Sequence, residues 1–305
     1  MRAALLHLDD ALAGQARLRA RALETGGAVV AANDLGPDLR LWSRMPALVR
    51  LGVRLREGLP AAAGPRLVFA GSGDFHHVTP GLVARAVEAS PGGPVTVVHI
   101  DNHPDWVRYS NGLHCGSWVG AAARTAGVAG VITLGVCSGD VGRGRVRDGD
   151  LTLIAEDRLA LYAYRSPDGG RELTIQGRTW PTIEALGIEA FVALLLEKIT
   201  TERVYLSLDK DVLRPADAAT NWDQGRMNAD ELFAILRAVL AHRRVIGADV
   251  VGDWSRPAYG GGLVAVALKR AEALLDQPWR APGPDGDAVN EALNLRLLDL
   301  FAEAA

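Results

Sequence analysis

Hydrophobic runs of strand length alternate with segments of helical spacing along most of the chain. Six runs rich in Val, Ile and Leu predict strands that are buried on both faces, because such strands have no polar face to alternate with. Strand followed by helix, repeated, predicts an α/β protein with a mainly parallel sheet. The predicted strands occupy residues 27–32, 66–71, 94–101, 130–136, 203–209 and 244–252.

Two of the intervening segments have clear helical periodicity. Residues 80–90 and 227–243 carry apolar side chains at the spacing of one helix face. Asn228 is placed to cap the second of these helices. Its apolar face consists of Leu232, Ile235, Leu236, Val239 and Leu240.

The remaining segments follow the pattern less closely. Residues 137–185 contain the turn sequences "RDGD" and "SPDGGRE", which predict an antiparallel excursion or surface loops. Residues 288–305 predict a terminal amphipathic helix. No repeat or low-complexity linker divides the sequence, so we expect residues 1–305 to form a single domain.

Composition and charge exclude several classes of protein. Lys and Arg number 33 against 36 Asp and Glu, and no basic run is interleaved with aromatic residues, so no nucleic-acid partner is expected. No apolar stretch approaches the roughly 18 residues of a membrane span. Asp9 and Asp10 interrupt the N-terminal apolar stretch, so export is not expected. The two cysteines, Cys115 and Cys137, are typical of a cytoplasmic protein.

Polar side chains follow four of the predicted strands directly. Ligands of open parallel sheets bind outside the carboxyl ends of the strands, so these residues are the candidates for chemistry. The four segments are "GSGDFHHVTP" (71–80), "DNHPDW" (101–106), "LDKDVLRP" (208–215) and "DVVGDWS" (249–255).

Four aspartates and two histidines in these segments predict a metal site. Side chains two residues apart on an extended segment point the same way, so "DNHPD" and "DKD" each converge on one point. Carboxylates gathered in a dry place repel one another unless a cation neutralises them. Oxygen ligands with some imidazole favour Mn²⁺ or another first-row divalent ion. The set of His76, Asp101, His103, Asp105, Asp209 and Asp211 suffices for two ions if carboxylates bridge.

Each motif alone also has a plain structural explanation. The "DNHPD" segment is typical of a capped loop, and Asp209 with Asp211 is placed to cap a turn. Phe75 and His76 stand where a dinucleotide-binding loop needs its last glycine, which excludes that alternative. His76 is the expected ligand and His77 a core or surface histidine. The conjunction of these motifs after buried runs favours the metal site.

Together the motifs resemble those of the ureohydrolases, the family of arginase and agmatinase. They occur in the family's order from about residue 66 to 262. "DNHPD" resembles the DAHxD signature, "SLDKDVLRP" (207–215) the SxDxDxxDP signature, "GSGDFHH" the GGDH segment, "SNGLHCG" (110–116) the SxxxHG loop, and "GADVVGDWS" (247–255) the last signature strand.

The resemblance implies a three-layer α/β/α fold around a parallel, eight-stranded sheet that binds two Mn²⁺ ions. His114 stands at the position of a mobile, proton-shuttling histidine, so His114 and the ligand Asp105 are the predicted catalytic residues. Relatives form trimers or hexamers, which predicts a homo-oligomer. Carried over residue by residue, one ion would be held by His76 and Asp105, the other by His103 and Asp211, and both by bridging Asp101 and Asp209.

The last signature strand departs from the family. Gly252 stands where guanidine-cleaving relatives have a glutamate that holds the guanidinium, and Asp253 follows it. Alternation along a strand would point these two residues to opposite faces. Either Asp253 takes over after a backbone shift or the substrate is not a free guanidinium. Arginine is therefore not the expected substrate.

The predicted substrate contacts are Ser110, Asp253 and Trp222. Ser110 matches a substrate-contact position of the family. Trp222, with Trp106 and Trp254, would form an apolar pocket wall, although each could instead pack a loop.

These observations predict a cytoplasmic, dinuclear manganese hydrolase that cleaves a C–N bond of a guanidino, amidine or ureido-like small molecule. Two alternatives stay open. A single-zinc amide deacetylase would dispense with the second-metal ligands that His76, Asp105 and Asp211 provide. A non-catalytic metal-bound scaffold or sensor stays possible because Gly252 replaces the usual glutamate.

Overall fold

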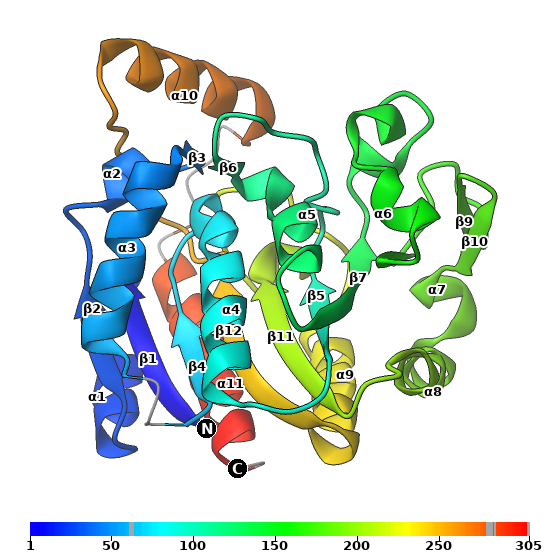
Figure 1. Ribbon diagram of the computed structural model, residues 1–305, viewed down its shortest axis with the longest axis horizontal. Helices are drawn as coiled ribbons and strands as arrows, with labels where there is room; N and C mark the ends of the chain where they lie inside the picture. Colours follow the sequence, from blue (N-terminus) through cyan, green and yellow to red (C-terminus); the bar gives the residue numbers. More distant parts are fainter. Residues whose placement is uncertain (61–63, 279–282, 284, 304–305) are drawn as a thin grey trace.

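A parallel sheet forms the centre of the molecule, and helices cover both of its faces (Figure 1). The computed structural model describes residues 1–60, 64–278, 283 and 285–303. Eight strands of the described chain pair in this sheet, and every neighbouring pair is parallel. In spatial order they are β2 (Ala28–Ala31), β1 (Arg2–His7), β4 (Arg66–Phe69), β12 (Arg244–Val251), β11 (Arg203–Asp209), β5 (Val95–Ile100), β7 (Val128–Val136) and β8 (Leu159–Ala163).

Two apolar clusters join the helical layers to the sheet. Alternate residues of one strand face opposite clusters: Val97 belongs to the first and Val98 to the second. The first cluster contains residues of α2 (Gly36–Leu39), α3 (Met45–Gly58), α4 (Thr79–Ala89), α5 (Trp118–Ala123) and α6 (Thr152–Ala155). The second contains residues of α1 (Ala16–Glu24), α7 (Ile183–Leu186), α8 (Ile188–Lys198), α9 (Ala229–His242) and α11 (Gly286–Glu303).

Smaller elements lie outside these layers. Helix α10 (Leu263–Asp276) projects beyond α2 and α3 at one end of the molecule (Figure 1). The other short elements are the antiparallel pairs β3 (Trp42–Ser43) with β6 (Leu113–His114) and β9 (Glu172–Ile175) with β10 (Arg178–Pro181), and the 3₁₀ helices η2 (Gly73–Val78), η3 (Cys115–Ser117), η4 (Gly139–Val141), η5 (Val146–Asp148) and η6 (Lys210–Val212).

This architecture confirms the predicted three-layer α/β fold, and each of the six predicted strands is present. The apolar pattern missed β1, whose short run ends near two aspartates, and β8, which lies in the region expected to be irregular. The β9–β10 hairpin confirms the antiparallel excursion in that region. Helix α11 confirms the predicted terminal helix, whose last two residues lie outside the described residues.

Local sequence explains where helix α9 begins. The Asn228 side chain accepts a hydrogen bond from the Glu231 amide at 3.0 Å, and the Glu231 carboxylate accepts one from the Asn228 amide at 2.9 Å. This capping box satisfies amides that the first turn of a helix leaves unpaired, and it confirms the predicted cap.

The strand order brings the four polar segments together. Strands β4, β12, β11 and β5 are consecutive neighbours in the sheet. Their carboxyl ends therefore lie side by side, at the centre of the strand order. Parallel sheets bind ligands just beyond the carboxyl ends of their strands. In the part of the chain that the structure describes, no helix is long and apolar enough to cross a membrane.

Candidate metal centre

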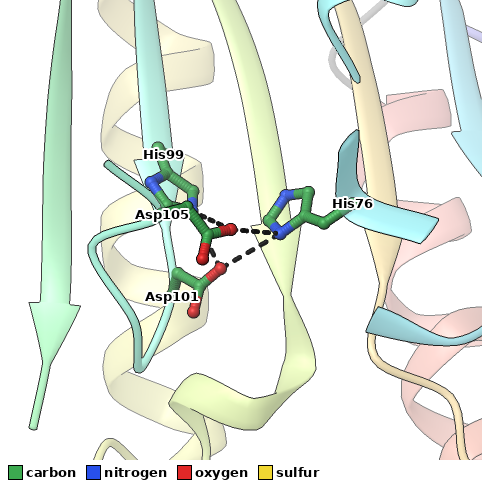
Figure 2. A group of neighbouring side chains, drawn as sticks. All are labelled: His76, His99, Asp101 and Asp105. Atoms are coloured by element: carbon green, nitrogen blue, oxygen red, sulfur yellow. Dashed lines mark hydrogen bonds and ion pairs between the residues drawn. The ribbon is translucent and has the colours of Figure 1, made fainter. Parts of the chain in front are cut away.

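Four buried side chains converge where β5 ends (Figure 2). His99 belongs to β5, Asp101 and Asp105 follow the strand, and His76 reaches them from η2. The Nδ1 atom of His76 lies 3.1 Å from Asp101 Oδ2 and 3.2 Å from Asp105 Oδ2. The Nε2 atom of His99 lies 2.8 Å from Asp101 Oδ2. These distances place one ligand atom of each residue around a common point.

A second group shares Asp101 with the first. It consists of Asp101, His103 and Asp211, the last from η6 at the end of β11. The Nδ1 atom of His103 lies 2.9 Å from Asp211 Oδ2 and 3.6 Å from Asp101 Oδ1. The two oxygens of Asp101 therefore face different groups, which is the arrangement of a carboxylate that bridges two cations.

The hydrogen bonds of His76 show why a cation fits the first group. Ser207 donates its hydroxyl hydrogen to Asp249 at 3.0 Å, so its oxygen is left to accept from His76 Nε2, 2.9 Å away. In a neutral ring with its proton on Nε2, the lone pair of Nδ1 points at the carboxylate oxygens of Asp101 and Asp105. Burial acts to lower the pKa of His76, yet these two carboxylates raise it well above its usual value, so Nδ1 attracts a proton where it could hold a cation. Acceptors that face one another need a cation between them.

His103 has the same arrangement in the second group. Its Nδ1 faces Asp211, while its Nε2 lies 2.9 Å from Asp223 Oδ1. A neutral imidazole donates through one nitrogen only. Asp223 can accept a hydrogen bond from a proton on Nε2, which leaves the Nδ1 lone pair facing the second group. Carboxylates behind metal-ligating histidines act in this way.

The buried surroundings of the site oppose the simultaneous ionisation of its four aspartates. Burial raises the pKa of Asp209 to about 7, and the nearby Asp101 carboxylate adds to the effect. Burial, followed by Asp101 and Asp209, also raises the pKa of Asp211 well above its usual value. Burial acts against ionisation of Asp101, yet His99, His103 and His76 hold its pKa well below its usual value. Without a cation, part of the negative charge is neutralised by protons on the aspartates. A bound cation would take over that role.

Asp209, the second predicted bridging ligand, lies beside both groups but in neither. Its Oδ2 is 3.6 Å from His76 Nδ1, and its Oδ1 accepts a hydrogen bond from the Asp211 amide at 2.9 Å. The carboxylate lies at the wall of the cavity described below. Its role as a ligand therefore stays a prediction.

The backbone at Asp105 is unusual. Its φ of +48° lies in the left-handed region, which aspartate tolerates better than most side chains. The Trp118 indole donates to Asp105 Oδ2 at 2.6 Å and fixes the carboxylate toward the first group. This combination is typical of functional sites, where surrounding contacts maintain a strained residue.

Sequence reasoning missed His99 because it lies inside an apolar run. A signal was present: His99 is two residues before Asp101, so both point to the same face of the strand. His76 faces the carboxylates, as expected, whereas His77 is buried outside both groups. Burial lowers the pKa of His77 to about 3, with His114 and Lys269 adding to the effect.

A cavity of about 520 Å³ opens beside the two groups. His114 and Trp222 line it, as does the buried Trp106, whereas Trp254 is not among the described lining residues. Ser110, a predicted substrate contact, is exposed and does not line this cavity. Of the three predicted contacts, only Trp222 is at the cavity wall.

Asp253 points away from the cavity, contrary to its predicted role. Its carboxylate is fully buried, 2.6 Å from Lys210 Nζ, and Asp253 is not among the residues that line the cavity. Gln15 donates to it at 2.8 Å, and Asn294 of α11 donates at 3.3 Å. The physical reason is that the chain turns at Gly252, just after β12 ends and with a φ of +92°, and the buried Lys210 ammonium pairs with the carboxylate that follows.

Gly252 has no room for a side chain. Its φ is +92°, and an added Cβ would lie 2.3 Å from Asp209 Oδ1 and 2.6 Å from the Lys210 amide nitrogen. Gly73 lies against the other oxygen of the same carboxylate, where a Cβ would be 2.5 Å from Asp209 Oδ2. Asp209 is thus held between two glycine backbones.

Fold and site together define an α/β protein with a candidate metal centre at the carboxyl edge of its sheet. Residues 56–255 match the model of the arginase family, and the chain belongs to that family. The putative agmatinase 3 of Schizosaccharomyces pombe is 27% identical over 222 residues, 70% of this chain and 48% of that protein. An uncharacterized protein of Thermotoga maritima is 26% identical over 195 residues, 64% of this chain and 60% of that protein. The chain thus spans about half to three-fifths of these relatives' length.

Solved structures have the same fold. Arginase from Bacillus cereus matches with a TM-score of 0.59 and 14% identity, covering 96% of both chains. Proclavaminate amidino hydrolase from Streptomyces clavuligerus matches with a TM-score of 0.51 and 21% identity, covering 87% of this chain and 75% of that one. The match to the arginase family model confirms the family suggested by the sequence motifs, and these structures share the fold.

Substitution of Gly252 should damage the metal centre. Gly252→Ala places a Cβ against Asp209 at a positive φ, so we expect a loss of more than about 1 kcal/mol in unfolding free energy and weaker metal binding. Urea denaturation and metal titration measure these effects. Gly139→Ala is the matched control, because Gly139 lines the same cavity and its Cβ would meet open space. Equal behaviour of the two variants would contradict the packing argument.

Substitution of Asp253 should destabilise the fold behind the site. Asp253→Asn leaves the buried Lys210 ammonium without its anion, which costs about 3–5 kcal/mol. The same change at Asp299, which pairs with Arg21 on the surface at 3.2 Å, should cost only about 0–1 kcal/mol. Thermal and chemical denaturation of both variants check the difference. A small effect at Asp253 would mean that Lys210 finds another partner.

Proposed function

We propose that the chain is a dinuclear metal hydrolase that cleaves a C–N bond of a guanidino, amidine or ureido-like small molecule. The observation that carries this proposal is Asp101, whose two oxygens face two ligand groups, each with a histidine. Membership of the arginase family supports the hydrolytic reaction. The similar amidino hydrolase and putative agmatinase support the choice of substrate class.

The donor set fits two first-row divalent ions, with Mn²⁺ the expected metal. Such a pair supplies the positive charge that makes water a nucleophile near neutral pH and polarises the substrate. His76, His99, Asp101 and Asp105 would hold one ion. Asp101, His103 and Asp211 would hold the other, with Asp209 available to both. His99 enters this set from its position in the structure.

His114 is the proposed source of the proton for the departing nitrogen. It lines the cavity and comes from β6, separate from both ligand groups. The Gly116 amide donates to its Nδ1 at 2.8 Å, so the proton of a neutral ring is on Nε2. Proton transfer by an imidazole contributes typically 10²–10⁴-fold to such reactions. Trp222 and Trp106 would limit the access of water to the reacting carbon.

The environment of position 252 supports a substrate other than arginine. The cavity receives no carboxylate from the end of β12, since Gly252 has no side chain and Asp253 is directed away. A guanidinium would therefore lack the anion that family members supply at this strand. Ureido-like compounds, which are neutral and need no such anion, are the first candidates.

The alternative of a single-zinc amide deacetylase lacks support from the second group. His103 and Asp211 lie 2.9 Å apart and share Asp101 with the first group, an arrangement that a one-metal site does not need. Metal stoichiometry distinguishes the two reactions.

A metal-dependent substrate screen tests the proposed function. Protein stripped by a chelator and reloaded with Mn²⁺ should bind two ions per chain. It should release urea, ammonia or an amine from at least one guanidino, amidino or ureido compound. Removal of the ions should abolish the release. Two bound ions with no turnover of any compound would favour the scaffold or sensor, and one bound zinc with amide cleavage would favour the deacetylase.

Loss of His114 should separate turnover from metal binding. His114→Ala should lower kcat by about 10²–10⁴-fold, because the departing nitrogen loses its proton donor. Metal content and melting temperature should stay those of the parent protein. His242→Ala is the control, since His242 is exposed on α9. Undiminished turnover by His114→Ala would exclude this residue as the donor.

A further inference from the structure

The two candidate metal positions offer different sets of ligands. The first group presents two imidazole nitrogens and two carboxylate oxygens, whereas the second presents one imidazole nitrogen and two carboxylate oxygens. The additional imidazole belongs to His99, inside strand β5. Imidazole ligands suit Zn²⁺, Fe²⁺ and Ni²⁺, whereas carboxylate ligands suit Mn²⁺. The two positions therefore differ in the kind of ion that they favour.

The four ligand atoms of the first group have the spacing of ligands around a tetrahedral ion (Figure 2). Bonds of about 2.1 Å to such an ion separate its ligands by about 3.4 Å. Asp105 Oδ2 lies 3.2 Å from His76 Nδ1 and 3.9 Å from His99 Nε2. Asp101 Oδ2 lies 3.1 Å from His76 Nδ1 and 2.8 Å from His99 Nε2. Four nitrogen and oxygen ligands in this geometry suit Zn²⁺.

A residue of the neighbouring strand orients the His99 ring. Thr133 of β7 is the register partner of His99, and its hydroxyl oxygen lies 3.1 Å from His99 Nδ1. That hydroxyl has no other hydrogen bond within the described residues, so it can accept from a proton on Nδ1. The Nε2 lone pair of a neutral ring then faces Asp101 and Asp105. A bound ion would replace the proton that Nε2 and Asp101 otherwise share.

The first group is also more rigid and more enclosed than the second. The Trp118 ring centre lies 4.7 Å from those of both imidazoles, and its indole donates to Asp105 Oδ2 at 2.6 Å. His99 is fully buried and is not among the described residues that line the cavity. In the second group, the side chain of His103 is 16% exposed, and that of Asp223 behind it is 57% exposed. Preorganised ligands bind more tightly than ligands that must first be ordered.

We propose that the two positions select different ions. The first group retains Zn²⁺ or another ion that favours imidazole, and the second takes Mn²⁺ and exchanges it more readily. This inference rests on the dinuclear centre of the proposed function and specifies its ions. His99 makes the difference, because each group without it would offer one imidazole and two carboxylates.

Anomalous scattering from crystals locates each ion without any substrate. The full-length protein is stripped by a chelator and crystallised with one equivalent of Zn²⁺ and an excess of Mn²⁺. Zinc should occupy the first position, with His99 Nε2 about 2.0–2.1 Å away, and manganese should occupy the second, beside His103. Equal zinc occupancy of both positions, or zinc mainly at the second, would overturn the proposal. So would a zinc ion at the first position that His99 does not contact.

Substitution of His99 should remove the difference between the two positions. His99→Val should weaken zinc binding at the first position by more than about 100-fold, because loss of a hydrogen-bond partner behind a ligand alone costs about 10–100-fold. Manganese binding should weaken less, since Mn²⁺ depends less on imidazole. Thr133→Val keeps the ring and removes its partner, so it should cost about 10–100-fold. Titration against a competing chelator measures these affinities.

His77→Leu is the matched control for the loss of a buried imidazole. His77 lies outside both groups, and neither of its ring nitrogens has a hydrogen-bond partner among the described residues. This variant should keep the zinc affinity of the parent protein. Unchanged zinc affinity in His99→Val, or an equal loss in His77→Leu, would contradict the role of His99.

These measurements need no turnover, so they separate this inference from the proposed function. Unequal ions in a protein that cleaves no compound would leave the inference in place while the proposed function fails. Cleavage by a protein whose two positions take zinc equally would support the function and overturn the inference.

Discussion

The structure of the site depends on one electrostatic constraint: several buried carboxylates and the Nδ1 atom of His76 converge at the carboxyl edge of the sheet. His76 Nδ1 faces oxygens of Asp101 and Asp105 at 3.1 and 3.2 Å, and its proton is committed to Ser207 on the other side of the ring. A protein does not bury such an arrangement without compensation. The carboxylates must take up protons or a cation, and the imidazole–carboxylate mixture suits a divalent metal.

The surroundings of the site limit how this charge can be relieved. Asp209 is enclosed by the backbones of Gly73 and Gly252, so it cannot move away from the cluster. Lys210, between two of the acidic residues, turns its ammonium away to the buried Asp253 rather than neutralising the cavity. The Lys210 ammonium therefore pairs with Asp253 in the interior and does not neutralise the carboxylates at the cavity. The cavity keeps its affinity for an added cation.

Much of this organisation could be predicted from sequence, because it depends on local pattern. Buried strands show as apolar runs, and the order of acidic residues after them located the cluster. What could not be predicted depends on three-dimensional direction. His99 is hidden in a strand interior, Asp253 faces the opposite side of the chain from Gly252, and Glu272 reaches His114 from a helix with no motif of its own. The β1 and β8 strands escaped because short runs carry little periodicity.

The glycine at position 252 limits which substitutions this site can accept. A single codon change to glutamate cannot be tolerated while the backbone keeps its left-handed turn against Asp209. A side chain at this position requires a different loop conformation around the candidate metal centre, because a Cβ would collide with Asp209 and with the Lys210 backbone. Changes in ligand preference are therefore expected to come from substitutions at other walls of the cavity.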